Sequence, residues 1–380
     1  MKKETDNLKQ VKIITIHFGT NHGSVLQAYA LSNYLKSVGC DAQIIDYIPD
    51  RYKIWNSLVS KKRKHYPLPV ILAYYPVAVL KSARIRNAFE RFLNKNLNLT
   101  SRYVSNEELK KNPPEADAYI SGSDQVWNND YNGNNDFSYF LDFAPEKSKC
   151  IAYAASFGKE NITEKDYINS IKPLLKSFDA VSVRESDARN ILNELDIPST
   201  HVVDPVFLLT KEQWKLFGNP IQNDEPYILV YVMDGLYGEL LDYAQKLKEK
   251  TGKKIYAVSF KKIKDERIAK CFYMANPKDF IGLIENADTV VTNSFHGTAF
   301  SVPFQKNFIS IGKEKYNSRM ISLLEKLNLK THFIPTGLNL SEDVVEKTVQ
   351  CDDVESVEQK LQEWIKLSKE FLDNSLNIQS

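Results

Sequence analysis

The sequence predicts an α/β protein made of two doubly wound halves, and two observations support this fold class. Short apolar, β-branched runs alternate with segments of helical periodicity along most of the chain, a pattern typical of mainly parallel sheets covered by helices. The length of 380 residues exceeds one simple core and suits two domains. The acidic, proline-bearing stretch 219–226 (NPIQNDEP) is the best candidate for the linker between them.

The first half opens with a β–α–β unit. Residues 11–16 predict a strand, apolar residues at helical spacing from Val25 to Leu35 predict a helix that ends near Gly39, and residues 41–47 predict the next strand. Because Gly19 and Gly23 do not form G-x-G-x-x-G, no dinucleotide fingerprint is present. Three further strands of this half are expected at residues 116–120, 150–155 and 180–183.

The second half repeats the alternation of strands and helices. Strands are expected at residues 227–233, 254–258, 288–291 and 307–311, and helices at residues 236–250, 277–286 and 297–304. The last predicted helix, near 354–372, has no strand after it, so we expect it to pack back across the junction. The predicted domains are therefore residues 1–218 and 219–380.

The composition is that of a globular protein, since 43% hydrophobic and 26% charged residues exclude a disordered or fibrous chain. A net charge of +2 indicates no partner class, and no nucleic acid is expected. The polar N-terminus leads straight into a strand, the wrong order for a signal peptide, so we expect a cytoplasmic protein. Neither a metal site nor disulfides are expected, because the cysteines lack CxxC pairs and nearby histidines: Cys40, Cys150, Cys271 and Cys351.

A basic and apolar segment at residues 61–86 has two readings. The cluster KKRKH at 61–65 precedes the apolar run 66–80, which three prolines interrupt, and Lys81, Arg84 and Arg86 follow. Fifteen residues are too few to span a bilayer, which takes about 20. The segment either lies on an anionic membrane surface or forms a buried helical excursion with a solvated basic collar.

The segment 292–301 (TNSFHGTAFS) is the most informative part of the chain. It places His296 just beyond an apolar strand, at the glycine-bearing turn into a helix. Open α/β sheets bind ligands at this point, and a helix start favours anions. His296 would then stand over a site for phosphate or carboxylate, and the alternative is a core or capping histidine.

A second motif, GSDQVWN at 122–128, also follows a predicted strand. Gly122 and Ser123 would leave backbone N–H groups for an anion or a sugar hydroxyl, and Trp127 would offer a face for stacking on a sugar. The alternative is a helix cap with Trp127 in the core.

The motif SVRE at 182–185 places Arg184 at the carboxyl end of a strand, where its planar fork suits carboxylate or phosphate. The alternative is an internal ion pair with Glu185 or Asp187.

Six motifs together resemble the polysaccharide pyruvyl transferase family in sequence and order. The resemblance covers about residues 11–327, and the motifs are NHGSVLQAYAL from Asn21, GSDQVWN from Gly122, YAASFG from Tyr153, SVRE from Ser182, VDPVFLL from Val203 and NSFHGTAFS from Asn293. The resemblance implies two Rossmann-like domains facing a cleft, similar to the GT-B glycosyltransferase fold. It also implies transfer of a pyruvyl group from phosphoenolpyruvate to two sugar hydroxyls, giving a cyclic ketal, with no cofactor.

The resemblance assigns roles to particular residues. His296, partly protonated at neutral pH, would be the acid or would remove the hydroxyl proton, and Asp124 would be a further base. Ser294 stands where relatives outside this subgroup often carry an arginine, and Arg319 is a candidate to replace that charge. The C-terminal half would bind the donor and the N-terminal half the acceptor. The expected donor-binding residues are Ser294, Gly297 and Arg319, together with Arg184 of the N-terminal half, and the expected acceptor-binding residues are His22, Ser123 and Trp127.

Two other classes of function remain open at this stage. A cleft between two Rossmann-like domains also suits a glycosyltransferase that uses a sugar nucleotide, because fold does not determine function. A non-catalytic saccharide-binding protein is the other class. For the pyruvyl transferase, the expected partners are phosphoenolpyruvate and a glycan acceptor linked to a lipid, at the cytoplasmic face of the inner membrane.

Overall fold

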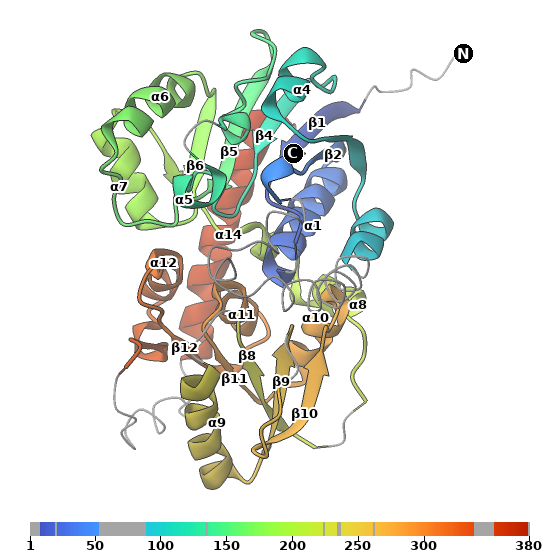
Figure 1. Cartoon of the computed structure of the whole chain (residues 1–380), viewed down its shortest axis with the longest axis vertical. Coiled ribbons are helices and arrows are strands. Elements are labelled where there is room, and N and C mark those ends of the chain that lie inside the picture. The colour runs from blue at the N-terminus through green and yellow to red at the C-terminus, as the bar shows by residue number, and fades with distance from the viewer. Residues whose placement is uncertain are drawn as a thin grey trace, which may run out of the picture.

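The chain folds into two parallel sheets, one above the other in Figure 1. The computed structural model describes residues 8–19, 21–52, 89–133, 136–222, 225–233, 237–260, 263–337 and 353–378. In these residues the first sheet has the strand order β3-β2-β1-β4-β5-β6-β7, and the second has the order β10-β9-β8-β11-β12-β13. Helices alternate with the strands in both sheets.

The first sheet and its helices come from the first part of the chain. Its central strands are almost wholly buried because helices cover both faces, which accounts for their continuous apolar runs. The strands are β1 (Lys9–Ile14), β2 (Cys40–Tyr47), β3 (Leu99–Tyr103), β4 (Ala118–Ser121), β5 (Lys149–Ala155), β6 (Ala180–Val183) and β7 (Thr200–His201). The helices are α1 (His22–Ser37), η1 (Asp50–Tyr52), α4 (Asn106–Lys111), α5 (Asn129–Asn132), η3 (Ser138–Phe140), α6 (Lys165–Lys176), α7 (Ser186–Glu194), η4 (Pro205–Phe207) and α8 (Lys211–Phe217).

The second sheet has the same parallel arrangement. Its strands are β8 (Tyr227–Tyr231), β9 (Lys254–Ser259), β10 (Ile268–Tyr273), β11 (Thr289–Thr292), β12 (Asn307–Ile311) and β13 (Phe333–Ile334). Its helices are α9 (Tyr237–Thr251), α10 (Pro277–Asn286), α11 (Phe295–Ser301), α12 (Ser318–Lys326) and η5 (Lys330–His332), and α14 (Val354–Leu376) follows.

Four strands have no counterpart in the sequence prediction, and all four are edge strands: β3, β7, β10 and β13. An edge strand is partly exposed, and the burial of β3 and β10 is accordingly incomplete. Such strands lack the continuous apolar run that marks a central strand. Helix α1 also begins earlier than its apolar pattern, because the Asn21 side chain accepts a hydrogen bond from the Gly23 N–H and caps it.

Helix α14 links the two sheets. In Figure 1 it runs as a red helix from the second sheet toward the first. Tyr34 donates a hydrogen bond of 3.0 Å to Asp373, and the Val203 N–H donates one of 2.9 Å to Ser368. The last helix therefore packs on the first half of the chain, against α1 and the segment that follows β7.

The basic and apolar segment at residues 61–86 lies outside the described residues. Among the residues that are described, no helix is both long and apolar enough to cross a membrane.

Candidate active site in the cleft between the sheets

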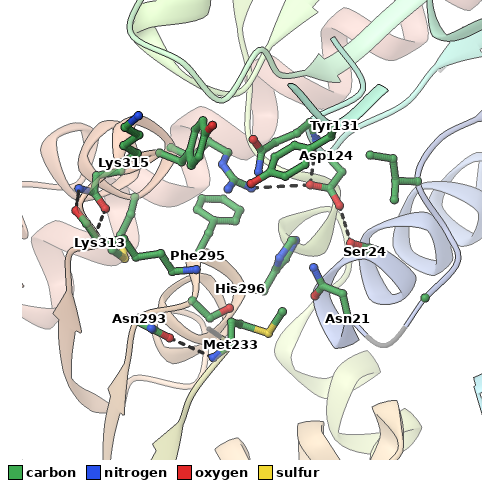
Figure 2. A pocket seen from close by; sticks show the side chains of 18 of the residues that line it. Asn21, Ser24, Asp124, Tyr131, Met233, Asn293, Phe295, His296, Lys313 and Lys315 are labelled. Carbon is green, nitrogen blue, oxygen red and sulfur yellow. Dashed lines mark hydrogen bonds and ion pairs between the residues drawn. The ribbon is translucent and has the colours of Figure 1, made fainter. Parts of the chain in front are cut away.

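A cavity of about 940 Å³ lies where the carboxyl ends of strands from both sheets meet. Its lining follows β1 and β4 of the first sheet and β8, β9, β11 and β12 of the second. Figure 2 shows Phe295 and His296 on one side of this cavity and Asp124 and Tyr131 on the opposite side. This is the position at which open α/β sheets bind ligands.

His296 is the second residue of α11 and lines the cavity, with 3% of its surface exposed. Its buried Nε2 has no hydrogen-bond partner and lies 3.8 Å from the Asp204 carboxylate. The other edge of the ring rests against Gly23 of α1, where an added Cβ would lie only 1.9 Å from Nδ1. The glycine in the NHGS motif therefore makes room for the imidazole.

Replacement of Gly23 with alanine is expected to lower kcat by about 10²-fold, because a displacement of about 1 Å in a reacting group can have that effect. Helix propensity favours alanine here, so a loss of activity without a loss of stability would locate the effect in the imidazole. Steady-state kinetics and urea unfolding measure the two. Gly238→Ala is the matched control, because an added Cβ there meets nothing within 4 Å. Unchanged kcat in Gly23→Ala would contradict the proposed fit.

Burial lowers the pKa of His296 to about 4, and the opposing effect of the Asp204 carboxylate is too small to restore it. The nearby Arg184 guanidinium lowers this pKa further. In the free protein the imidazole is therefore neutral at neutral pH, and the expectation of partial protonation from sequence is wrong. A neutral imidazole with an open Nε2 can accept a proton.

Arg184 is buried in an ion-pair cluster instead of facing the cavity. Its Nη1 donates a hydrogen bond of 2.6 Å to Asp204, and its Nη2 donates one of 3.1 Å to Asp124. Only 2% of the residue is exposed. The expectation that its fork is open to the donor is therefore wrong for this structure, because two carboxylates occupy the guanidinium. Its alternative reading as an internal ion pair is correct, because Glu185 lies 3.9 Å from the Arg184 Nε, although Asp204 and Asp124 are the closer partners.

Asp124 lines the cavity and is held between the two sides of the cleft. It accepts a hydrogen bond of 2.5 Å from Ser24 of α1, and Arg319 lies 3.6 Å away. Burial would raise the pKa of Asp124, but Arg184 and Arg319 outweigh it and hold the pKa at about 2. A carboxylate with so low a pKa is a poor proton acceptor, so the structure does not support Asp124 as a base.

Two residues expected on the acceptor side are covered by protein. Ser123 is fully buried, donating to Asp204 and accepting from Arg184, so it serves the ion-pair cluster. Trp127 is 1% exposed, with its ring stacked on Phe140. The expectation of a sugar-stacking face on Trp127 is wrong, because the indole packs in the core of the first sheet.

His22 is also fully buried. The expectation that it contacts the acceptor is therefore wrong. Its ring stacks between Phe260 and Phe280, at centroid distances of 4.9 and 4.7 Å. Its Nε2 donates to the Ala275 carbonyl oxygen at 2.8 Å. His22 therefore fastens α1 to the second sheet, and burial lowers its pKa to about 4.

The start of α11 is capped by its own chain. Ser294 lines the cavity, but its Oγ accepts a hydrogen bond from the Gly297 N–H, and its carbonyl oxygen accepts one from Thr298. Gly297 is packed against Thr292 and does not line the cavity. The expected anion site on the Gly297 N–H is therefore closed.

Positive side chains line the cavity on another element, the loop between β12 and α12. Lys313, Lys315 and Arg319 all contribute to the lining. Asn317 holds this loop together, since it accepts from the Lys313 N–H at 2.8 Å and donates to the Lys313 carbonyl oxygen at 2.6 Å. Figure 2 shows Lys313 extending toward the interior of the cavity. These cations suit an anionic ligand.

Comparison with known proteins identifies the family of the chain. The family model of polysaccharide pyruvyl transferase matches residues 21–315, a range that contains Gly23, Asp124 and His296. The chain belongs to the polysaccharide pyruvyl transferase family. It is therefore related to enzymes that transfer a group, and its part in polysaccharide biosynthesis follows from the same family. No curated protein matches the chain in sequence.

Solved structures of other enzymes share the fold. The co-structure of MnaA with UDP from S. aureus has a TM-score of 0.53 and 11% sequence identity, covering 98% of each chain. The UDP-N-acetylglucosamine 2-epimerase from Rickettsia bellii has a TM-score of 0.50 and 12% identity, covering 97% of each chain. The expected fold, two Rossmann-like domains similar to the GT-B glycosyltransferase fold, is therefore confirmed.

Two features of this family member were not assigned from the sequence. Asp204 of the VDPVFLL motif organises the buried cluster, because Arg184 and Ser123 donate to it and His296 lies beside it. The VDPVFLL motif was the sequence signal that could have identified Asp204. The Asp204 side chain also caps the turn η4. The second feature is the aromatic lining of the cavity around Tyr131, for which short-range patterns provide no signal.

Among the described residues, no cluster of three or more histidine, cysteine, aspartate or glutamate side chains is arranged to hold a metal ion.

Proposed function

We propose that this family member transfers the pyruvyl group of phosphoenolpyruvate to two hydroxyls of a sugar, forming a cyclic ketal and releasing inorganic phosphate. The observation that carries the proposal is the buried imidazole of His296, whose Nε2 lacks a partner beside a cavity lined with cations. Family membership supports the class of reaction.

The donor carries a phosphate and a carboxylate, so its site needs several positive charges. Lys313, Lys315 and Arg319 line the cavity, and the Arg319 guanidinium lies 5.7 Å from the Phe295 ring centroid. The buried Nε of Arg319 has no hydrogen-bond partner. We assign donor binding to these three side chains, with Arg319 supplying the charge that is absent at Ser294. Arg184 does not line the cavity, and it neutralises the negative charges of Asp124 and Asp204.

The proton balance of the proposed reaction gives His296 two tasks. The methylene carbon of phosphoenolpyruvate gains a proton, which makes C2 electrophilic, and the first sugar hydroxyl forms a bond to C2 and loses its proton. The C2–O bond to phosphate then breaks, and the second hydroxyl attacks C2 and loses its proton. Of the two hydroxyl protons released, one replaces the proton given to carbon and the other leaves on phosphate. An imidazole that alternates between its protonated and neutral forms can move these protons.

Binding of phosphoenolpyruvate is expected to take up protons, because an anion beside His296 raises its pKa from the value of about 4 in the free protein. The ordinary pKa of histidine is about 6.5. At about pH 6, binding would therefore convert the His296 imidazole from mostly neutral to mostly protonated. Calorimetry in buffers of different ionisation enthalpy measures the uptake. It should disappear in His296→Gln. Binding without uptake in the unmodified protein would contradict this role of His296.

The proposed function has a direct test. The protein is incubated with phosphoenolpyruvate and a panel of lipid-linked and nitrophenyl glycosides, and phosphate release and the mass of an added pyruvyl ketal are measured. Parallel incubations with UDP-sugars test the alternative, a glycosyltransferase that uses a sugar nucleotide, which the fold also accommodates. Glycosyl transfer without ketal formation would replace the proposal with that alternative.

We further propose that the acceptor is a glycan precursor assembled on a lipid carrier at the cytoplasmic face of the membrane. Phosphoenolpyruvate is a cytoplasmic metabolite, which supports this location. The basic residues of segment 61–86 would attract an anionic surface. Binding to anionic vesicles that weakens as salt rises would support this part of the proposal, and absence of binding at low salt would overturn it.

A further inference from the structure

Four aromatic side chains line one part of the cavity: Phe18, Tyr52, Tyr131 and Tyr316. Tyr52 and Tyr131 are 38% and 47% exposed, which places them among the most exposed large apolar side chains of the described residues. Aromatic rings usually bury most of their surface in a core. The exposure of Tyr52 and Tyr131 at a cavity therefore indicates a surface that binds a ligand.

The four rings form one connected group, which we call the aromatic rim. The rings of Phe18 and Tyr52 lie 5.0 Å apart, and those of Tyr131 and Tyr316 lie 5.8 Å apart. The Tyr52 hydroxyl donates a hydrogen bond of 2.8 Å to the Tyr131 carbonyl oxygen, which joins the two pairs. The rim is therefore a fixed surface instead of a set of independent side chains.

Tyr316 completes the rim from the opposite side of the cleft. It lies in the loop between β12 and α12, and its hydroxyl donates a hydrogen bond of 2.8 Å to Asp130 of the first half. Its φ is +70°, a left-handed conformation that is unfavourable for a bulky aromatic residue. Such strain concentrates at binding sites, where the surrounding structure maintains it. Asn317 maintains it here through its two hydrogen bonds to Lys313.

We propose that the aromatic rim is the acceptor subsite, where a pyranose ring of the glycan stacks with its C–H face on Tyr131. This inference rests on the proposed function, which places the donor at the cationic loop and His296. Ring hydrogens of a sugar are electropositive, and the face of an aromatic ring is negative, so the two attract. The hydroxyls of Tyr52 and Tyr316 donate their protons to protein acceptors, and each can still accept a hydrogen bond from a sugar hydroxyl.

The size of the cavity supports a second ligand beside the donor. Cavities of about 300–1,000 Å³ enclose drug-sized ligands, and phosphoenolpyruvate is much smaller than those. A cavity of about 940 Å³ therefore leaves room for at least one sugar ring. Figure 2 shows Tyr131 close to Asp124 and across the cavity from Asn293 and Met233, so a sugar on this ring would face the His296 side.

The test uses saturation-transfer NMR of the full chain without phosphoenolpyruvate, with methyl glycosides of glucose, galactose, mannose and N-acetylglucosamine as probes. Irradiation of aromatic protons is expected to saturate the ring hydrogens of at least one pyranoside at high millimolar concentration. The signal should be lost in Tyr131→Ala and retained in Tyr131→Phe, which keeps the ring. Tyr52→Ala, on a different element, should weaken it, whereas Leu216→Ala, an exposed side chain outside the cavity, should not.

With turnover established, Tyr131→Ala is expected to raise the acceptor KM by about five- to tenfold, with an unchanged Kd for phosphoenolpyruvate. Absence of saturation transfer to every pyranoside, or equal transfer in Tyr131→Ala, would overturn the acceptor subsite. Sugar binding without donor binding or phosphate release would instead leave the subsite in place and refute the proposed reaction.

Discussion

Replacement of His296 with alanine is expected to lower kcat by about 10²–10⁴-fold, the usual contribution of a positioned acid–base group. The imidazole of His296 is buried at the cavity and its Nε2 lacks a hydrogen-bond partner. In the proposed mechanism it acts as both the acid and the base. Phosphate release and ketal mass measure the rate. The fold should survive, because α11 is held by Ser294 and by packing that does not involve the imidazole.

A second histidine provides the matched control. Burial also lowers the pKa of His201 to about 4, but His201 does not line the cavity and packs against Trp364. His201→Phe should therefore change stability more than kcat. Near wild-type phosphate release by His296→Ala would end the assignment of His296. An equal loss of rate in both variants would point to a general disturbance of the fold.

Replacement of Arg184 with methionine is expected to lower the free energy of unfolding by about 3–5 kcal/mol, the usual effect of removing one partner from a buried ion pair. The change leaves Asp124 and Asp204 without their shared cation, and both carboxylates are buried. Urea unfolding followed by circular dichroism measures the loss.

An exposed ion pair provides the comparison for Arg184. Lys172 pairs with Asp196, whose side chain is 82% exposed, so Lys172→Met should cost at most about 1 kcal/mol. Adding Asp204→Asn to Arg184→Met should recover part of the stability, because it removes one uncompensated charge. An Arg184→Met variant as stable as the unmodified protein would refute the structural role.

Arg184→Lys separates that structural role from donor binding. A lysine retains the charge but cannot reproduce the two-pronged geometry, so Asp124 or Asp204 would lose its hydrogen bond. The disturbed cluster should weaken donor binding indirectly, through Asp124 and Arg319. Unchanged stability together with weaker donor binding would instead indicate direct contact of Arg184 with phosphoenolpyruvate.

Local sequence patterns were sufficient to predict the central strands of both sheets and several residues that line the cavity. The central strands of both sheets are buried on both faces, so each needs a continuous apolar run that is visible in the sequence. Polar residues just after such a strand fall at the carboxyl edge of the sheet. For that reason Asp124, Ser294 and His296 were correctly expected at the cleft.

Packing between distant segments determined which of these side chains face a ligand. Arg184 lies 20 residues from Asp204 and 60 from Asp124, and this pairing removes its guanidinium from the cavity. His22 and Trp127 are covered in the same way by aromatic rings from other elements. The aromatic rim arises only where the loop after β1, the turn η1 and the short helix α5 of the first half meet the loop between β12 and α12 of the second. Periodicity reports burial along a single element, whereas burial, pKa and exposure at a site depend on which elements the fold brings together.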